Sequence, residues 1–433
     1  MGSVFLVAYN LAWSVALPFL ACSSRLRQGW GQRVFPSGFR RRADLWIQAS
    51  SAGEAYLATQ LIESCPELNK KRVVITCSTT QGLEVLNKTL RPQGGQLQVN
   101  QVELGYFPFD MPFIMGKALE NITPKAVVIL ETELWPGLLG QCKKQDIPVL
   151  LINGRLSERS YRRYMGFVSL WRRYAPSKIL AVSEQDAQRF KNLYPQVSVD
   201  VMKNMKFDRI SFKSRQAHKI KPKFLEGVAT RTFVVLASIR KEEEADILEA
   251  IRGLYLKTPD VVIGLFPRHM HRVKAWVKLL KSEGIGFVLR SQTSSLDHPG
   301  MVILWDVFGE LADIYGVATA VFVGGTLRPC GGQNFLEPLG SGLVPCIGPY
   351  WDNFAWVGKE IIRSGLVTEV RDVRELVDAL MNEMQRKRDR EEVVRKAAKY
   401  IGERQGGTER ACKEILGLLA AGTTRATSVK GAS

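Results

Sequence analysis

The chain of 433 residues contains short segments that place charged side chains beside small residues, a combination that suits chemistry on a bound ligand. One is Ser50-Ser51-Ala52-Gly53-Glu54, where small residues allow a ligand to approach the backbone closely. The carboxylate of Glu54, in the first turn of a predicted helix, is placed to act as a general base toward a hydroxyl group. The alternative is that Glu54 only stabilises the helix dipole, as acidic residues in first turns commonly do.

Two further carboxylates lie in Glu131-Thr132-Glu133-Leu134-Trp135-Pro136, directly after an apolar stretch that is typical of a buried strand. Carboxylates at the end of a buried strand need a partner or a function, because an unpaired buried charge is costly. The alternative is that these residues cap the helix that follows.

Three segments in the second half of the chain suit the recognition of a phosphate and a nucleoside. Glycine pairs, in Gly324-Gly325-Thr326 and at the start of residues 331–338, expose backbone N–H groups that bind phosphate, and Asn334 or Glu337 is suited to ribose hydroxyls or a base edge. Pro267-Arg268-His269 offers an arginine for bidentate phosphate binding, although a solvated basic loop is the alternative. Phe308-Gly309-Glu310 also follows a predicted strand and is expected at the same edge of the sheet.

Arginines alternate with aromatic residues throughout residues 155–173. Such a segment suits nucleic acid or, equally, anionic lipid head groups at a membrane surface. The net charge of +18 also indicates an anionic partner. A nucleic-acid-binding protein would leave the glycine-rich and carboxylate segments unexplained, so we predict no nucleic acid partner and favour lipid.

The N-terminal region supports the lipid interpretation. Residues 4–22 are almost wholly apolar, about the length that spans a bilayer, and six arginines follow between residues 25 and 42. We predict an uncleaved anchor with the rest of the chain in the cytoplasm, since a cleaved signal peptide needs basic residues before its apolar run. The remaining alternative is a hydrophobic helix that lies on the membrane or on the protein itself.

The elements that position these segments form two βα series. Strands are predicted at residues 45–49, 73–77, 126–130, 149–152 and 179–182, and then at residues 233–237, 261–266, 302–304, 320–323 and 344–347. Alternation with helices predicts an α/β protein with parallel sheets, whose ligands bind at the carboxyl ends of the strands. We expect an anchor and basic segment at residues 1–42, a domain at 43–205, a linker at 206–231, a second domain at 232–421 that includes C-terminal helices, and a disordered tail at 422–433.

Cysteine and histidine usage limits the chemistry further. The seven cysteines include no C-x-x-C pair and are expected to be reduced thiols. The four histidines show no metal-binding spacing, so no metal site is predicted.

Taken together and in order, these segments resemble the 3-deoxy-D-manno-octulosonic acid (Kdo) transferase family of lipopolysaccharide biosynthesis. The matching segments are residues 49–54, 131–136, 152–157, 204–208, 267–269 and 331–338. The resemblance implies a GT-B fold, with two Rossmann-like domains facing each other across a cleft. It further implies an inverting transfer of Kdo from CMP-Kdo to a hydroxyl of the lipid A precursor (lipid IVA) with release of CMP and no other cofactor, on the cytoplasmic face of the inner membrane among anionic lipids.

The resemblance also implies roles for individual residues. Glu54 is the base that deprotonates the acceptor hydroxyl, and Glu131 and Lys206 assist the transition state. The residues implied to bind CMP are Pro267, Arg268, Phe308, Gly309, Glu310, Asn334, Phe335, Leu336 and Glu337. This chain departs from the family pattern at Lys203, Arg240, Gln333 and Tyr350, mostly on the donor side. These departures keep open an alternative, a GT-B transferase of another nucleotide sugar onto a lipid-linked acceptor.

Overall fold

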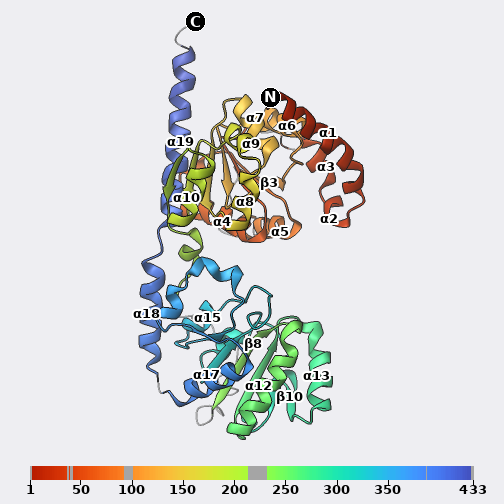
Figure 1. Cartoon of the computed structure of the whole chain (residues 1–433), viewed down its shortest axis with the longest axis vertical. Coiled ribbons are helices and arrows are strands. Elements are labelled where there is room, and N and C mark those ends of the chain that lie inside the picture. Colours follow the sequence, from red (N-terminus) through yellow and green to blue (C-terminus); the bar gives the residue numbers. More distant parts are fainter. Residues whose placement is uncertain are drawn as a thin grey trace. The chain divides into compact units, whose positions relative to one another are not determined.

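A computed structural model describes residues 2–36, 39, 42–91, 101–212, 232–386 and 388–430, without the side chains of residues 2–4, 25 and 422–430. The chain forms two compact units (Figure 1). The first contains residues Met1–Arg209 together with Arg404–Ser433, and the second contains Ile210–Glu403. The chain therefore leaves the first unit once and later returns to it.

The first unit is built on a sheet of seven parallel strands. They are β1 (Leu45–Ala49), β2 (Val73–Cys77), β3 (Val102–Tyr106), β4 (Ala126–Leu130), β5 (Val149–Gly154), β6 (Lys178–Ala181) and β7 (Ser198–Val201). Their order is β3-β2-β1-β4-β5-β6-β7. Because successive strands are added to one side of β1 and then to the other, the strand order reverses between β1 and β4, which is where ligands of such sheets bind.

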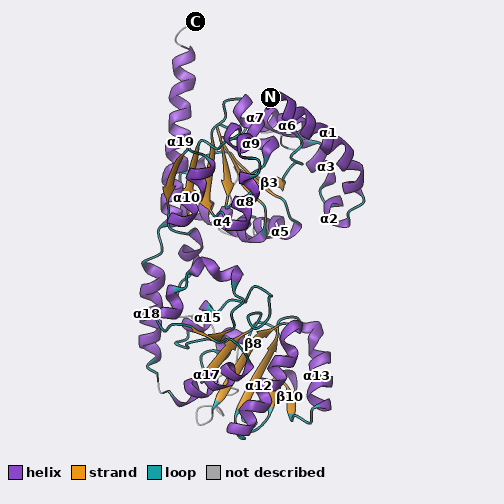
Figure 2. Cartoon of the chain, viewed as in Figure 1, coloured by secondary structure: helices purple, strands orange, loops and turns teal. Residues whose placement is uncertain are grey.

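Helices cover both faces of this sheet (Figure 2). They are α4 (Ala52–Ser64), α5 (Thr80–Leu90), α6 (Pro112–Ile122), α7 (Pro136–Lys144), α8 (Glu158–Met165), α9 (Val168–Arg173), α10 (Glu184–Leu193) and α19 (Gly407–Lys430). Alternate residues of β1 point to opposite faces. Leu45 and Ile47 join a core that includes residues of α4, α5 and α19, whereas Trp46 joins a core with residues of α6, α7 and α10.

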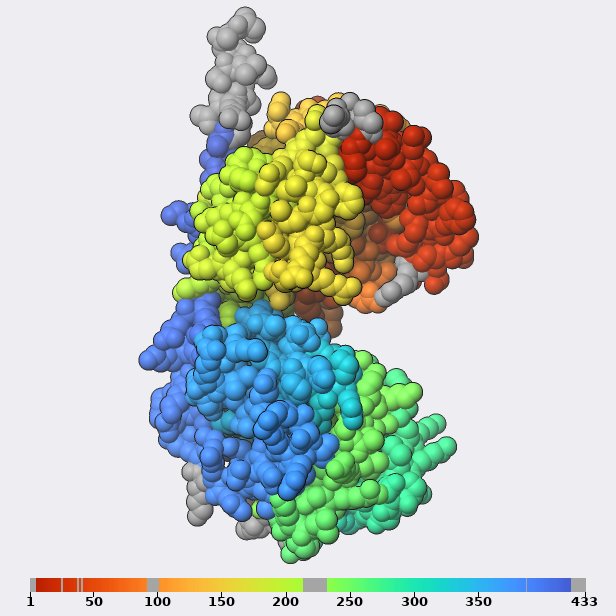
Figure 3. Space-filling view, in the orientation of Figure 1, coloured from red at the N-terminus to blue at the C-terminus, as the bar shows by residue number. Residues whose placement is uncertain are grey.

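Among the described residues, three α-helices precede β1: α1 (Gly2–Ala21), α2 (Ser24–Arg27) and α3 (Trp30–Val34). One face of α1 packs on the rest of the first unit: the rings of Trp13 and Phe109 are tilted, with centroids 5.5 Å apart, and Tyr9 donates a hydrogen bond to Asp110 at 3.1 Å. The opposite face exposes Val7, Leu11, Val15 and Phe19. Figure 3 shows these helices at the surface of their unit. In the described part of the chain, no helix has the combination of length and apolar character that crossing a membrane requires.

The second unit has its own sheet of seven parallel strands, in the order β10-β11-β9-β8-β12-β13-β14. They are β8 (Phe233–Ile239), β9 (Val262–Pro267), β10 (Phe287–Leu289), β11 (Val302–Leu304), β12 (Ala320–Val323), β13 (Cys346–Ile347) and β14 (Thr368–Glu369). Its helices are α12 (Glu244–Lys257), α13 (Val273–Ser282), α14 (Leu311–Ile314), α15 (Leu336–Leu339), α16 (Glu360–Arg363), α17 (Val373–Gln385) and α18 (Arg390–Gly402). Here the strand order reverses between β8 and β12.

The predicted α/β class with two parallel sheets is confirmed, and all ten predicted strands overlap observed ones. The C-terminal part is grouped differently from the prediction, because residues from Arg404 onward belong to the first unit rather than the second. The reason is packing: Ala411, Cys412, Ile415 and Leu419 of α19 are buried in the core that contains β1. The tail expected to be disordered from residue 422 continues α19 to Lys430, and residues 213–231 of the expected linker lie outside the described residues.

Candidate functional site

The reversal point of the first sheet brings together the two predicted acidic segments. β1 pairs with β4, so the loops that follow these two strands are neighbours at the carboxyl edge of the sheet. Glu54 follows β1, in the first turn of α4, and Glu131 follows β4 directly. The strand order therefore brings the two acidic segments to the same edge of the sheet.

Glu54 is almost fully buried, with 6% of its surface exposed. Its carboxylate accepts hydrogen bonds from the Ser50 backbone N–H at 2.5 Å and from the Ser51 hydroxyl at 3.1 Å. Burial raises the pKa of Glu54 to about 8; the Ser50 and Ser51 hydrogen bonds oppose this shift, whereas the nearby charges of Glu131 and Glu133 add to it. A residue that only complemented a helix dipole would have no reason to be buried among other carboxylates, so the environment favours the acid–base interpretation.

Lys206 joins this site through an ion pair. Its Nζ lies 2.6 Å from Oε1 of Glu131, and both side chains are mostly buried. Glu131 has a φ of 59°, in the left-handed region that residues with a Cβ rarely adopt. Such backbone strain persists only where the surroundings impose it, and it concentrates at functional sites. The three residues predicted as catalytic thus lie at one edge of one sheet.

The carboxylates of residues 131–136 do not cap α7, which was the alternative for this segment. That helix begins at Pro136, and its capping is done by Asp110, whose carboxylate accepts from the N–H groups of Gly137 and Leu138, both at 2.8 Å. A side chain at Gly137 would collide with the Asp110 backbone, so glycine permits this close approach. Glu131 and Glu133 therefore do not cap this helix. Burial raises the pKa of the Glu133 carboxyl group.

The predicted donor-binding segments share the carboxyl edge of the second sheet. Phe308 follows β11, Arg268 follows β9, and Gly324 follows β12. These strands lie close together in the sheet, in the order β11-β9-β8-β12. Arg268 and Phe308 are both exposed. The structure thus brings an arginine, an aromatic ring and a glycine-rich loop to one edge, a combination suited to a nucleotide.

A buried glutamate that the sequence reasoning missed organises this edge. Glu243 is completely buried and accepts hydrogen bonds from the backbone N–H groups of Gly325, Thr326 and Leu327 at 2.5–2.8 Å. It also accepts from the N–H of Arg240 at 3.3 Å. Four donors on one carboxylate fix the loop after β12 against the loop after β8. Glu242-Glu243-Glu244 looks in sequence like an ordinary acidic helix start, which gave no signal of this role.

The other residues predicted to bind the CMP-Kdo donor differ in how far they are available to a ligand. The carboxylate of Glu310 already contacts the protein: it pairs with Arg290 at 2.8 Å and accepts a hydrogen bond from Trp305 at 2.9 Å. Phe335 and Leu336 are buried, whereas Asn334 and Glu337 are exposed and share a hydrogen bond of 3.1 Å. Asn334 and Glu337 thus expose side-chain polar atoms to a ligand, as Arg268 does.

The loop that carries Asn334 depends on glycine. Gly331 and Gly332 have φ values of 83° and 84°, a conformation that glycine adopts without steric cost. The N–H of Gly332 donates to the carbonyl of Gly325 at 2.7 Å, which joins this loop to the one that Glu243 holds. Pro267 ends β9, and the N–H of Arg268 donates to Ile239 at 2.8 Å.

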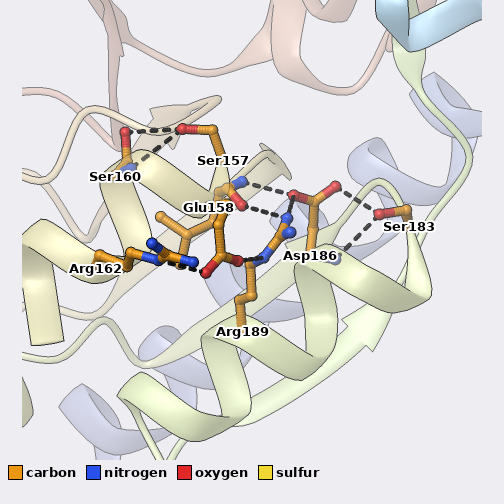
Figure 4. Close-up of polar contacts among 8 residues, drawn as sticks. Ser157, Glu158, Ser160, Arg162, Ser183, Asp186 and Arg189 are labelled. Carbon is orange, nitrogen blue, oxygen red and sulfur yellow. Dashed lines mark hydrogen bonds and ion pairs between the residues drawn. The ribbon is translucent and has the colours of Figure 1, made fainter.

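The basic segment of residues 155–173 is fixed by polar contacts between α8 and α10 (Figure 4). Asp186 accepts from the Leu156 N–H at 2.7 Å, and Arg189 bonds to both the Leu156 carbonyl and the Glu158 carboxylate, at 2.9 and 3.2 Å. Most aromatic side chains of this segment pack against the core, while Phe167 and the arginines at positions 159, 162, 163, 172 and 173 are exposed. The segment therefore exposes positively charged side chains, while its aromatic side chains and the contacts with α10 hold it on the first unit.

No group of three or more histidine, cysteine, aspartate or glutamate residues within the described ranges is arranged to hold a metal ion. All seven cysteines are free thiols.

Comparisons with known proteins show the family of the chain. Residues 28–209 match the family model for 3-deoxy-D-manno-octulosonic-acid transferase (kdotransferase). The chain is 30% identical over 406 residues to the 3-deoxy-D-manno-octulosonic acid transferase of Haemophilus influenzae, covering 90% of this chain and 91% of that one.

Solved structures agree on the fold. A UDP-N-acetylglucosamine 2-epimerase has a TM-score of 0.56 at 14% identity, over 87% of this chain and 96% of its own. Acinetobacter baumannii MurG has a TM-score of 0.50 at 11% identity, over 86% and 98%. The predicted GT-B fold is confirmed by these likenesses.

Proposed function

The chain belongs to the Kdo transferase family and is a glycosyltransferase, and we propose that it moves Kdo from CMP-Kdo to a hydroxyl of the lipid A precursor, lipid IVA. The observation that carries this proposal is the site at the reversal point of the first sheet, where Glu54 is buried near Glu131 and Lys206 pairs with Glu131 at 2.6 Å. A carboxylate, a second carboxylate and an ammonium group in one partly dry site suit proton removal and charge stabilisation.

Glu54 acts as the general base in this proposal. The acceptor O–H bond breaks as its proton moves to the Glu54 carboxylate, and the oxygen forms a bond to the anomeric carbon of Kdo. The bond from that carbon to the phosphate oxygen breaks, and its electron pair leaves with CMP, which inverts the configuration. A carboxylate whose pKa is about 8 is a stronger base than an ordinary glutamate, which supports this role.

Lys206 and Glu131 stabilise the transition state rather than move a proton. The ammonium group of Lys206 supplies fixed positive charge, and the ion pair with Glu131 holds it in one position without reorganisation during the reaction. On the donor side, Arg268 and the glycine-rich loop held by Glu243 are suited to the CMP phosphate, and Phe308 to the base.

The direct test is transfer by the purified full chain. With CMP-Kdo and lipid IVA, we expect CMP release and a lipid product heavier by one or more Kdo units in mass spectrometry. Absence of both, under conditions where a family relative is active, would contradict the proposal.

Nucleotide competition tests the alternative donor. CMP is expected to inhibit transfer and to bind more tightly than UDP or GDP. Preference for UDP or GDP would favour the alternative transferase, to which the departures at Arg240 and Gln333 point.

We also place the enzyme on the cytoplasmic face of the inner membrane, docked through α1. The exposed face of this helix repeats an apolar residue every four positions, at Val7, Leu11, Val15 and Phe19, with exposed fractions of 60–76%. The opposite face is held by the protein, so α1 would lie along the lipid surface as interfacial helices do. Exposed arginines of residues 155–173 add attraction to anionic lipids.

Vesicle co-sedimentation tests this placement. A Leu11→Gln, Val15→Gln double variant is expected to bind vesicles that contain anionic lipid several-fold more weakly than the wild type. Leu256→Gln, which changes an exposed leucine of α12, is the matched control. Equal sedimentation of the double variant and the wild type would remove α1 from this role.

A further inference from the structure

The segment that carries Lys206 is a single short turn, η3 (Met205–Arg209). Turns of this type have little stability of their own, so their position depends on partners elsewhere. The N–H of Met205 donates to the Asn153 side chain at 2.9 Å, and the N–H of Lys206 donates to Asn204 at 3.0 Å. These contacts hold the start of the turn and leave its remaining residues to other partners.

The C-terminal return of the chain supplies those partners. The carboxylate of Asp208 accepts from the N–H of Gly406 at 2.6 Å, and from the N–H and hydroxyl of Thr408 at 2.7 and 2.6 Å. The Gln405 side chain donates to the carbonyl of Phe207 at 3.0 Å. Asp208 is separated from Thr408 by 200 positions, so the turn is fixed by residues from the far end of the chain.

The same hydroxyl also reaches the helix that carries Glu54. Gln60, on α4, donates to the carbonyl of Met205 at 3.0 Å and to Oγ1 of Thr408. Thr408 is 4% exposed, and its hydroxyl accepts from Gln60 while it donates to Asp208. The two supports of the site, α4 and the Lys206 turn, are therefore connected through one buried hydroxyl.

The backbone at the start of α19 approaches the turn closely. A side-chain carbon at Gly407 would lie 2.2 Å from the carbonyl oxygen of Lys203 and 3.0 Å from the nitrogen of Met205. The distance of 2.2 Å to a backbone atom is too short for non-bonded atoms, so a larger residue here would force the backbone to shift. Contact between main chains leaves the turn little freedom to move relative to α19.

We propose that Thr408 is a positioning residue of the transferase, which sets the place of Lys206 relative to Glu54 through Asp208 and Gln60. The inference rests on the proposed function, in which Lys206 stabilises the transition state. A displacement of about 1 Å at a reacting site costs on the order of 100-fold in rate, so a loosened turn lowers kcat even when the fold persists.

Three variants of the full chain separate positioning from general stability. Thr408→Val keeps the shape of the side chain but removes both hydrogen bonds of the hydroxyl, and Thr408→Ser keeps the hydroxyl. Glu414→Gln is the control on the same helix as Thr408, and it weakens the ion pairs of Glu414 with Lys178 and Arg410. We expect Thr408→Val to lower kcat by about 10- to 100-fold with the KM for CMP-Kdo changed less than about twofold. Thr408→Ser and Glu414→Gln are expected to retain kcat within about threefold.

A second readout does not depend on activity. The rate at which an amine-selective reagent modifies Lys206, followed by peptide mass spectrometry, reports how firmly the Lys206–Glu131 pair is held. It is expected to rise several-fold in Thr408→Val and to stay unchanged in Glu414→Gln.

Two results would overturn the inference. One is full kcat in Thr408→Val. The other is a loss of kcat that is proportional to the loss of melting temperature, with the same proportion in Thr408→Val and in Glu414→Gln. If the wild type transfers no Kdo, the proposed function fails, while the modification rates still decide whether Thr408 positions Lys206.

Discussion

At the scale of single residues, the site depends on a carboxyl group held in an unfavourable environment. The pKa of Glu54 is raised to about 8, chiefly by burial, so near neutral pH most of this group is protonated in the free enzyme. The deprotonated form that the proposed reaction needs becomes the majority only above that value. The pH dependence of activity should therefore report this one residue.

We predict that kcat/KM rises with pH and levels off above about pH 8, because deprotonation of Glu54 creates the base. Glu54→Gln should lower kcat by roughly 100- to 10,000-fold and remove this rise. Steady-state kinetics between pH 6 and 9.5 measures both. Glu63→Gln, an exposed change on the same helix, is the control. A pH-independent wild type, or an active Glu54→Gln, would exclude Glu54 as the base.

The same shift makes a prediction about stability. The folded state binds a proton at Glu54 more tightly than the unfolded state, whose pKa is near the ordinary 4.5, so stability is lost as pH rises from that value through about 8. Glu54→Gln cannot ionise and escapes this loss. Its melting temperature should exceed that of the wild type by several degrees at pH 9, with a smaller difference at pH 5. An equal difference at both pH values would contradict this prediction.

On the donor side, we predict that Glu243→Gln weakens CMP binding. An amide has one acceptor oxygen where the carboxylate has two, so at least one N–H of the loop after β12 loses its partner. The unpaired buried group costs about 1–3 kcal/mol, and the displaced loop should bind CMP several-fold more weakly. Calorimetric titration with CMP measures the effect, and Glu242→Gln, on the exposed neighbour, is the control. Unchanged affinity in Glu243→Gln would show that the loop does not contribute.

Individual residues also show what sequence reasoning can and cannot find. Glu54, Glu131 and Lys206 could be named as candidates because each stands in a segment with a recognisable pattern. The roles of Asp110 and Glu243 could not be found in this way, because Asp110 accepts from backbone N–H groups 27 and 28 positions away and three of the four N–H partners of Glu243 are 82 to 84 positions away. Such partners become visible only when the loops are placed together in space.

At the scale of elements, the strands that the sequence did not predict are β3, β7, β10 and β14, which are the four edge strands. Central strands are covered on both faces and are continuous apolar runs, as in β4, where every residue is buried. Edge strands are shorter or partly exposed, as in β7, where only Val199 is buried. Their hydrophobic signal is therefore weak, whereas the strands that position the site are central and were predicted.

The docking of α1 gives a prediction at this scale. Tyr9 donates to Asp110, the residue that caps α7, and burial raises the pKa of Asp110 to about 7. Tyr9→Phe removes that hydrogen bond, worth about 0.5–1.5 kcal/mol, and should raise amide hydrogen exchange in α1 about 2- to 10-fold. Exchange followed by mass spectrometry measures this, with Ser14→Ala on the same helix as the control. Unaltered exchange in Tyr9→Phe would show that the apolar contacts alone hold α1.

At the scale of the whole molecule, the unpredicted feature is the return of the chain to its first unit. The sequence predicts helices in the C-terminal part, but periodicity cannot tell which of two cores an apolar helix face covers. The structure assigns it to the first core through Ala411, Cys412, Ile415 and Leu419.

Truncation tests that assignment. A chain that ends at Glu403 should lose the unfolding transition of the first unit, or undergo it at least about 10 °C lower, because four buried side chains lose their contacts. The transition of the second unit should remain, and differential scanning calorimetry resolves the two. A first unit that melts as in the full chain would show that α19 adds nothing to its core.

The hydrogen bond between Asp208 and Gly406 has a consequence for how such enzymes diversify. The chain leaves the first unit after Arg209 and returns at Arg404, so these two crossing points are fastened to each other and the second unit is an insert between them. A recombination that replaces residues 210–403 as one block exchanges the second unit, to which the proposed function assigns the nucleotide, and keeps the first unit whole. A single crossover at residue 209 also replaces α19, and with it the residues that support Lys206. Under the proposed function, donor specificity can therefore pass between enzymes when the whole of residues 210–403 is exchanged, but not when two chains are joined at residue 209.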